Sequence, residues 1–205
     1  KRAERRRLID PAKTIIASLP RLVDGIAVEV PLTGRNESTQ YIAELSYRSV
    51  MAGENGTIKV DIGLREPLLC PAAVKNIRTL ARHVFTGEEL VPAFPVRVLA
   101  LNEALAEKTR AALTRREAAI RDFFDLQYAM NHLDLHLDNP DFIALLRQKL
   151  SIPGTEPVQL TAERRKTLEK QCQTELAAVL RSRDHATFNL EIIWTALLKL
   201  AEKLR

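Results

Sequence analysis

The sequence predicts an α+β protein, in which a small antiparallel or mixed palm-like sheet is followed by an α-helical C-terminal half. Strand-like runs that alternate apolar and polar residues occupy residues 25–66. From residue 102 to the end, apolar residues recur with the 3.6-residue period of helices. With 205 residues, 46% of them hydrophobic, the chain can bury a stable core.

The first expected element is a short helix over residues 10–23. Asp10 can cap its first turn, and Pro11 takes the first helical position, where no backbone N–H is needed. Pro20 is expected to end or kink this helix.

Three strands are expected next, over residues 25–32, 39–50 and 56–66, with a turn at 51–56 that joins the last two into a hairpin. Alternation in the third strand places Asp61 and Arg65 on the face opposite to its apolar side chains. Those apolar side chains are Ile58, Val60, Ile62 and Leu64.

Prolines interrupt residues 67–95, and residues 96–101 read as a further strand that leads into the helices. We therefore expect two domains, a palm-like sheet domain at 1–100 and a helical domain at 101–205. Residues 151–161 are the best candidate for a linker.

The helical half opens with two helices that are expected to meet at Thr114. Asn102 can cap the first, and residues 114–117 form a capping-box pattern for the second. On one continuous helix, Lys108 and Asp122 would lie about 21 Å apart, because each residue rises about 1.5 Å. A bend between the helices brings them together.

Asp122 and Asp125 are three residues apart and therefore neighbours on one helix face. Two carboxylates so placed repel each other unless a cation lies between them, and Arg121 is the nearest candidate in sequence. Two interpretations stay open: a salt-bridge network that pins the two helices, with Lys108 or Arg115 against Asp122, or a functional site.

Composition narrows the function classes. The formal net charge is +5, and basic residues cluster at 1–7, 164–166 and 181–183. These clusters either bind a polyanion such as RNA or lie on helix faces that are exposed to solvent. Cys70 and Cys172 match no metal or redox spacing, so a reduced, cytoplasmic protein is expected. No apolar run reaches membrane-spanning length, so no membrane partner is expected.

The strand IKVDIGLRE (58–66) and the later VRVLALNEALAEKTRAALTRREAAIRDFFDL (96–126) resemble the AbiEii/AbiGii toxin-type nucleotidyltransferases, which are related to polymerase-beta-like enzymes. The resemblance covers roughly residues 41–135. It implies a mixed sheet with a helical C-terminal half, and transfer of a nucleotidyl group from a nucleoside triphosphate to an acceptor, for some members the 3' end of tRNA. It also implies a toxin that a co-encoded antitoxin neutralises.

Carried over to this sequence, the resemblance makes Asp61, Lys108 and Asp122 the candidate catalytic residues. Asp61 would be a ligand of Mg²⁺ or a base, Lys108 would bind the triphosphate, and Asp122 would orient Lys108 or the acceptor. The candidate nucleotide-binding residues are Arg65, Arg115, Arg121 and Asp125.

The sequence departs from the family pattern at its start. That pattern opens with a Gly-Gly or Gly-Ser turn followed by an Asp-x-Asp pair, whereas this chain has only Gly25 and then Glu29. We therefore expect Lys1 to follow that motif, and the chain alone to be inactive. The alternative is a non-catalytic module of the same fold that binds RNA or an antitoxin.

Overall fold

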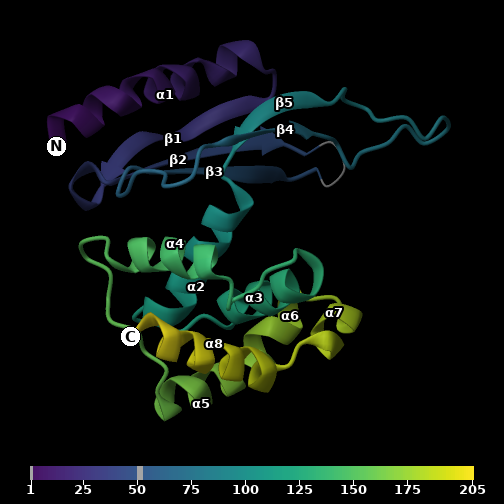
Figure 1. Ribbon diagram of the computed structural model, residues 1–205. Coiled ribbons are helices and arrows are strands. Elements are labelled where there is room, and N and C mark those ends of the chain that lie inside the picture. The colour runs from purple at the N-terminus through teal and green to yellow at the C-terminus, as the bar shows by residue number, and fades with distance from the viewer. Residues whose placement is uncertain (1, 50–52) are drawn as a thin grey trace. The chain divides into compact units, whose positions relative to one another are not determined.

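The chain forms two compact units, residues 1–67 and 68–205, in a computed structural model that describes residues 2–49 and 53–205 (Figure 1). The α+β prediction is confirmed, since small antiparallel sheets are followed by a helical C-terminal half. The expected division at residue 100 coincides with the start of the first helix after the strands, and it stays a prediction about functional domains.

The N-terminal unit is a three-stranded antiparallel sheet in the order β1-β2-β3, with one long helix packed on it. Ile9 and Ile16 of this helix, seven residues apart, are buried in the core of the unit. The sheet contributes Leu32, Tyr41, Ala43 and Leu45 to the same core. The elements are α1 (Arg2–Leu22), β1 (Ile26–Arg35), η1 (Asn36–Ser38), β2 (Gln40–Arg48) and β3 (Asn55–Gly63).

Helix α1 is longer than the sequence indicated. It begins at Arg2 rather than residue 10, and it continues through Pro11 and Pro20. The helix ends at Leu22, two residues after Pro20, close to the predicted end at residue 23, and Val23 N donates to Leu19 O at 2.9 Å beyond the proline. Burial of one apolar face against the sheet stabilises the helix across both prolines, so packing outweighs local sequence preference.

The predicted strands are confirmed, and β2 pairs with β3 in a continuous register that sets Tyr47 opposite Gly56. A Cβ atom on Gly56 would lie 2.2 Å from the Tyr47 ring, so only glycine fits beneath that ring. Residues 50–52, which include the start of the predicted turn, lie outside the described residues.

The C-terminal unit begins with an antiparallel strand pair and continues with helices. The strand expected at 96–101 is β5 (Phe94–Val98), and its partner β4 (Ala73–Ile77) was not predicted. None of the helices in the described residues is long and apolar enough to cross a bilayer. The helical elements are α2 (Leu101–Thr114), α3 (Ile120–His132), α4 (Pro140–Leu150), α5 (Ala162–Gln171), the π-helical turn η2 (Cys172–Leu176), α6 (Ala177–Val179), α7 (Ser182–Thr187) and α8 (Leu190–Leu204).

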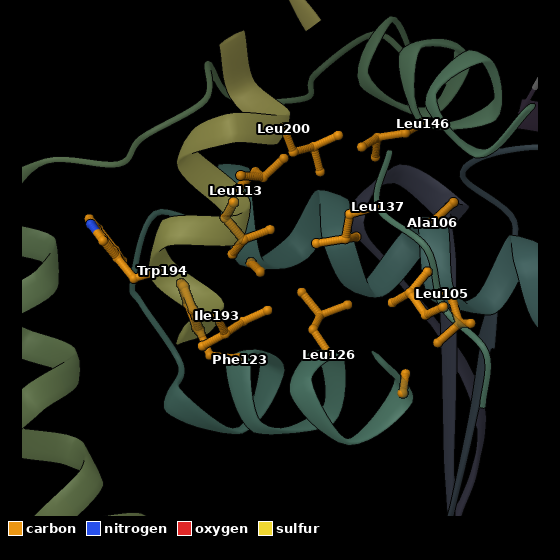
Figure 2. Packing of buried hydrophobic residues seen from close by; sticks show 14 of the residues in the cluster. Leu105, Ala106, Leu113, Phe123, Leu126, Leu137, Leu146, Ile193, Trp194 and Leu200 are labelled. Atoms are coloured by element: carbon orange, nitrogen blue, oxygen red, sulfur yellow. The ribbon is translucent and has the colours of Figure 1, made fainter. Parts of the chain in front are cut away.

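The core of this unit lies between α2, α3, α4 and α8 (Figure 2). Phe123 of α3 stacks on Trp194 of α8, with ring centroids 6.2 Å apart. Leu113 and Leu126, both fully buried, belong to the same cluster. The packing therefore holds α2 and α3 in fixed relation to each other.

The predicted break after α2 is confirmed at Thr114, but the predicted caps are wrong. Asn102 lies inside α2, which begins at Leu101. The Thr114 hydroxyl donates to Arg110 O at 2.8 Å within its own helix, so it cannot cap the next one. Helix α3 starts only at Ile120, which leaves residues 115–119 as the connection.

Candidate active site

The bend between α2 and α3 brings together the charges that the sequence singled out. Lys108 Nζ lies 2.5 Å from Asp125 Oδ2 and 3.7 Å from Asp122 Oδ1. Arg115, in the connection, places Nη1 at 3.3 Å from Asp122 Oδ2. Lys108 thus lies between two carboxylates of α3, which offsets their mutual repulsion.

Burial differs sharply within this group. The Asp122 side chain is 7% exposed, whereas Lys108 and Asp125 are 44% and 42% exposed. Asp122 Oδ2 is buried and makes no hydrogen bond, although the Arg115 guanidinium lies near it. Asp122 is therefore a buried anchor, and the accessible groups are Lys108, Asp125 and Arg115.

Arg164 of α5 adds a buried cation to the cluster, at the C-terminal end of α2. Its guanidinium donates to Arg115 O at 2.7 Å and to Ala112 O at 3.1 Å, two carbonyls at the C-terminal end of α2. Burial lowers the pKa of Arg164, the Asp122 charge opposes that effect, and the Arg115 charge adds to it. Arginine nevertheless stays protonated at neutral pH. Sequence reasoning placed Arg164 only in a basic surface cluster.

Gln171, at the end of α5, fixes the α2–α3 connection. Its amide donates to Ala118 O at 2.9 Å, and its side-chain oxygen accepts from Ile120 N at 3.1 Å. This pair of bonds sets where α3 begins, and therefore where Asp122 lies in its first turn. The sequence offered no signal for Gln171.

The electrostatic balance of the cluster favours an anionic ligand. Lys108 and Arg115 pair with the carboxylates of Asp122 and Asp125, and the charge of a third cation, Arg164, interacts with that of Asp122. One positive charge is therefore left uncompensated within the group. Lysine and arginine side chains at a half-open surface suit the oxygens of a phosphate.

Asp61 and Arg65 belong to the N-terminal unit, whereas the Lys108 cluster belongs to the C-terminal unit. Asp61 is exposed on β3, as its alternation predicted. The Gln40 amide nitrogen lies 3.0 and 2.9 Å from its two carboxylate oxygens. Arg65 pairs with Glu66 at 3.2 Å.

Comparison with known proteins settles the family. The model of the nucleotidyl transferase AbiEii toxin family, from type IV toxin–antitoxin systems, matches residues 2–197. The chain belongs to this family. The resemblance inferred from the sequence is thereby confirmed. The family is one of nucleotidyltransferase toxins, and in toxin–antitoxin systems such a toxin has an antitoxin partner.

Two solved structures from Helicobacter pylori are similar to this AbiEii family member, one assigned as a nucleotidyltransferase and the other the protein JHP933. Each is 17% identical to it with a TM-score of 0.42 over 89% of this chain. The matches span 68% and 66% of their chains. No curated protein matches at a significant level.

The donor set for a metal ion is sparse. Within residues 2–49 and 53–205, no three His, Cys, Asp or Glu side chains gather as a metal-binding group. Asp61, exposed and held by one amide, keeps acceptor capacity on both oxygens. One carboxylate fits Mg²⁺ when substrate phosphates and water supply the remaining ligands, which is the usual pattern for that ion.

Arg121 does not bridge the two aspartates, and the suggestion that it would is wrong. Arg121 is exposed and, within the residues that the structure describes, forms no ion pair with Asp122 or Asp125. The observed cations near the carboxylates are Lys108 and Arg115, which come from the preceding helix and the connection. A role for Arg121 in nucleotide binding stays a prediction.

A second lysine–carboxylate group in the same unit is fully buried. Glu103 accepts from Lys149 Nζ at 2.6 Å and from the backbone N–H groups of Leu69 and Cys70 at 2.8 and 2.6 Å. Both side chains of the pair are 0% exposed, and Lys149 also contacts Glu107 at 2.8 Å. Because solvent does not reach this pair, its role is to hold α2, α4 and the segment at Leu69 and Cys70 together.

Proposed function

We propose that this AbiEii family member is an NTP-dependent nucleotidyltransferase that acts as a toxin and modifies an acceptor such as the 3' end of tRNA. The observation that supports it most is the half-exposed Lys108, set between Asp122 and Asp125 at the positions where the family resemblance expects its lysine and aspartates. Salt bridges alone would also pin the helices, but they would not require a net positive group open to solvent.

In this proposal, Lys108 and Arg115 bind phosphate oxygens of the triphosphate. Both side chains are about half exposed, so they can approach a ligand without unfolding of the core. Lys108 exchanges the Asp125 carboxylate for a phosphate, while Asp122 keeps the ammonium group in place from its buried position. Arg164 holds the end of α2, and with it the register of Lys108.

The transfer step joins an acceptor hydroxyl oxygen to the α-phosphorus and breaks the bond to the departing pyrophosphate. Negative charge builds on the phosphate oxygens, and Lys108 with Arg115 stabilises it. For Asp61, which lies in the N-terminal unit, the family resemblance suggests that it holds Mg²⁺ or accepts the hydroxyl proton, and within that unit the Gln40 amide donates to its carboxylate. Bound Mg²⁺ would supply further charge neutralisation at the reacting phosphate.

The test is a transfer assay with labelled nucleoside triphosphates, Mg²⁺ and total tRNA, run on the protein as its gene encodes it. We expect label on RNA and a loss of about 100-fold or more in Lys108→Ala, as for other removed transition-state donors. Lys199→Ala is the matched control, because Lys199 is an exposed lysine of the same unit and lies outside the basic clusters.

The outcomes separate the two readings of the family fold. Label that is lost in Lys108→Ala but kept in Lys199→Ala supports the enzyme. Equal loss in both variants contradicts a specific role for Lys108. RNA that is retained by every protein without acquiring label would instead favour a non-catalytic RNA-binding module.

A further inference from the structure

The N-terminal unit contains a pocket of about 500 Å³ that the proposed transfer reaction does not use. It lies between α1, the end of β1 and the turn η1. Four cations line it: Arg2, Arg6 and Lys13 from α1, and Arg35 from the end of β1. A volume of this size is in the range of small-molecule binding pockets.

The helix spacing explains why these cations converge. Arg2 and Arg6 are four residues apart, and Lys13 follows seven residues later, so all three share one face of α1. Within the part of the chain that the structure describes, Lys13 pairs with Asp10 at 3.2 Å, and no ion pair involves Arg2, Arg6 or Arg35. The one carboxylate of the lining is that of Glu37, which is exposed.

The base of the pocket is rigid. Tyr41 is 3% exposed and Ser38 is 7% exposed, and both line the pocket. A Cβ atom on Gly34 would lie 3.1 Å from the Tyr41 ring, so β1 passes closely over that ring. Close packing keeps the polar groups of this lining in place when a ligand enters.

The turn η1 carries backbone strain at the pocket wall. Asn36, Glu37 and Ser38 have φ angles of 47°, 54° and 65°, three successive left-handed residues of which none is glycine. Hydrogen bonds hold this conformation: Thr39 Oγ1 donates to Asn36 O at 2.7 Å, and the Asn36 amide donates to Gln40 at 3.1 Å. Such strain persists where the surrounding structure enforces it, often at ligand sites.

From these observations we infer that the pocket binds the phosphate group of a phosphate-bearing ligand, presented by an RNA backbone or by a free phosphate compound. Three guanidinium groups and the Lys13 ammonium group line the pocket, against the carboxylate of Glu37 in the lining and that of Asp10 beside Lys13, and such cations recognise phosphate by charge and by paired hydrogen bonds. This inference goes beyond the proposed transfer reaction, because none of its residues belongs to the Lys108 cluster and binding can be measured without catalysis.

The experiment measures binding by the full chain of a fluorescent single-stranded oligouridylate, with EDTA present so that no divalent cation contributes. We expect Arg6→Glu combined with Arg35→Glu to weaken binding about tenfold or more, and to reduce the salt dependence by about two counterions. Glu37→Gln should strengthen binding. Arg21→Glu is the matched control, since Arg21 is an exposed arginine of α1 outside the pocket.

Competition with inorganic pyrophosphate distinguishes the two sources of the phosphate group. Displacement of the RNA by pyrophosphate in the parent, but not in the double variant, assigns the pocket to free phosphate compounds. RNA binding that resists pyrophosphate assigns it to the RNA backbone.

Two results would overturn the inference: equal weakening by Arg21→Glu, which means that only overall charge matters, or unchanged binding in the double variant. Circular dichroism of each variant verifies that the fold is kept, and the neutral pair Arg6→Gln with Arg35→Gln repeats the test with a milder change.

Discussion

Two lysine–carboxylate groups in the C-terminal unit are chemically alike and differ in their surroundings. Lys149 and Glu103 are fully buried, whereas Lys108 and Asp125 are 44% and 42% exposed. Glu103 accepts three hydrogen bonds, one from the buried Lys149 ammonium and two from the backbone N–H groups of Leu69 and Cys70. A charge pair that is buried and fully hydrogen-bonded stabilises the fold. A charge pair that is half exposed can exchange one of its partners for a ligand.

The largest effect on stability is expected from Glu103→Ala. This change removes the fully buried carboxylate that accepts from the Lys149 ammonium at 2.6 Å, so the free energy of unfolding should fall by about 3–5 kcal/mol. Denaturant unfolding followed by fluorescence of Trp194, the single tryptophan of the chain, measures it. Glu156→Ala, which breaks the exposed pair with Arg116, is the control. A loss below about 1 kcal/mol for Glu103→Ala would contradict the comparison.

Acid should lower the free energy of unfolding through Glu103, by a smaller amount than Glu103→Ala does. Burial alone would raise the pKa of Glu103, but the Lys149 hydrogen bond and the Leu69 and Cys70 N–H groups together hold that pKa below its ordinary value of 4.5. The unfolded chain therefore takes up this proton first as the pH falls. The stabilisation is complete above pH 4.5 and is lost as the pH drops through the lower folded-state pKa.

The check is the free energy of unfolding of the parent and of Glu103→Gln as a function of pH. Other carboxylates contribute to acid unfolding in both proteins, so the difference between the two curves isolates Glu103. That difference should be constant near neutral pH and shrink in acid. A difference that stays constant down to the acid transition would mean that Glu103 is not held ionised.

Within the exposed cluster, Asp122→Asn should cost more stability than Asp125→Asn. Asp122 is buried beside Arg115 and Arg164, and loss of its charge leaves those guanidinium groups less compensated, at about 1–3 kcal/mol. Asp125 is 42% exposed, so its change should stay within about 0.5 kcal/mol. Both variants replace a carboxylate by an amide. Equal losses in the free energy of unfolding would contradict the distinction between a buried Asp122 and an exchangeable Asp125.

Lys108→Ala should also cost little stability, within about 1 kcal/mol, because its pairs are half exposed. The same variant should show the largest loss in the transfer assay. Thermal unfolding beside that assay gives both quantities. If Lys108→Ala destabilises the unit as much as Glu103→Ala does, the cluster is a structural salt-bridge network and the comparison fails.

The local parts of this architecture could be predicted from the sequence. Alternation placed Asp61 on the exposed face of its strand, and the helix break predicted that Lys108 could reach Asp122. Both arguments use residues within one strand or one pair of adjacent helices.

The missed features depend on distant partners. Arg164 contacts backbone groups 49 and 52 residues before it, and Lys149 contacts Glu103 across 46 residues. Spacing rules reach only about one helical turn, so neither partner could be found from them. The length of α1 was missed for a related reason, since burial of Ile9 and Ile16 against the sheet outweighs the local effect of two prolines.

Arg164 and Gln171 hydrogen-bond to the end of α2 and to the start of α3. The motif therefore cannot be transferred to another protein without them. Every recognisable motif residue of the C-terminal unit lies between Lys108 and Asp125, yet the junction that aligns them is fastened by α5, far along the chain. A chimera that grafts only those motif helices onto another scaffold would copy the signature and lose the alignment. For inheritance and for engineering alike, the transferable module extends at least through Gln171.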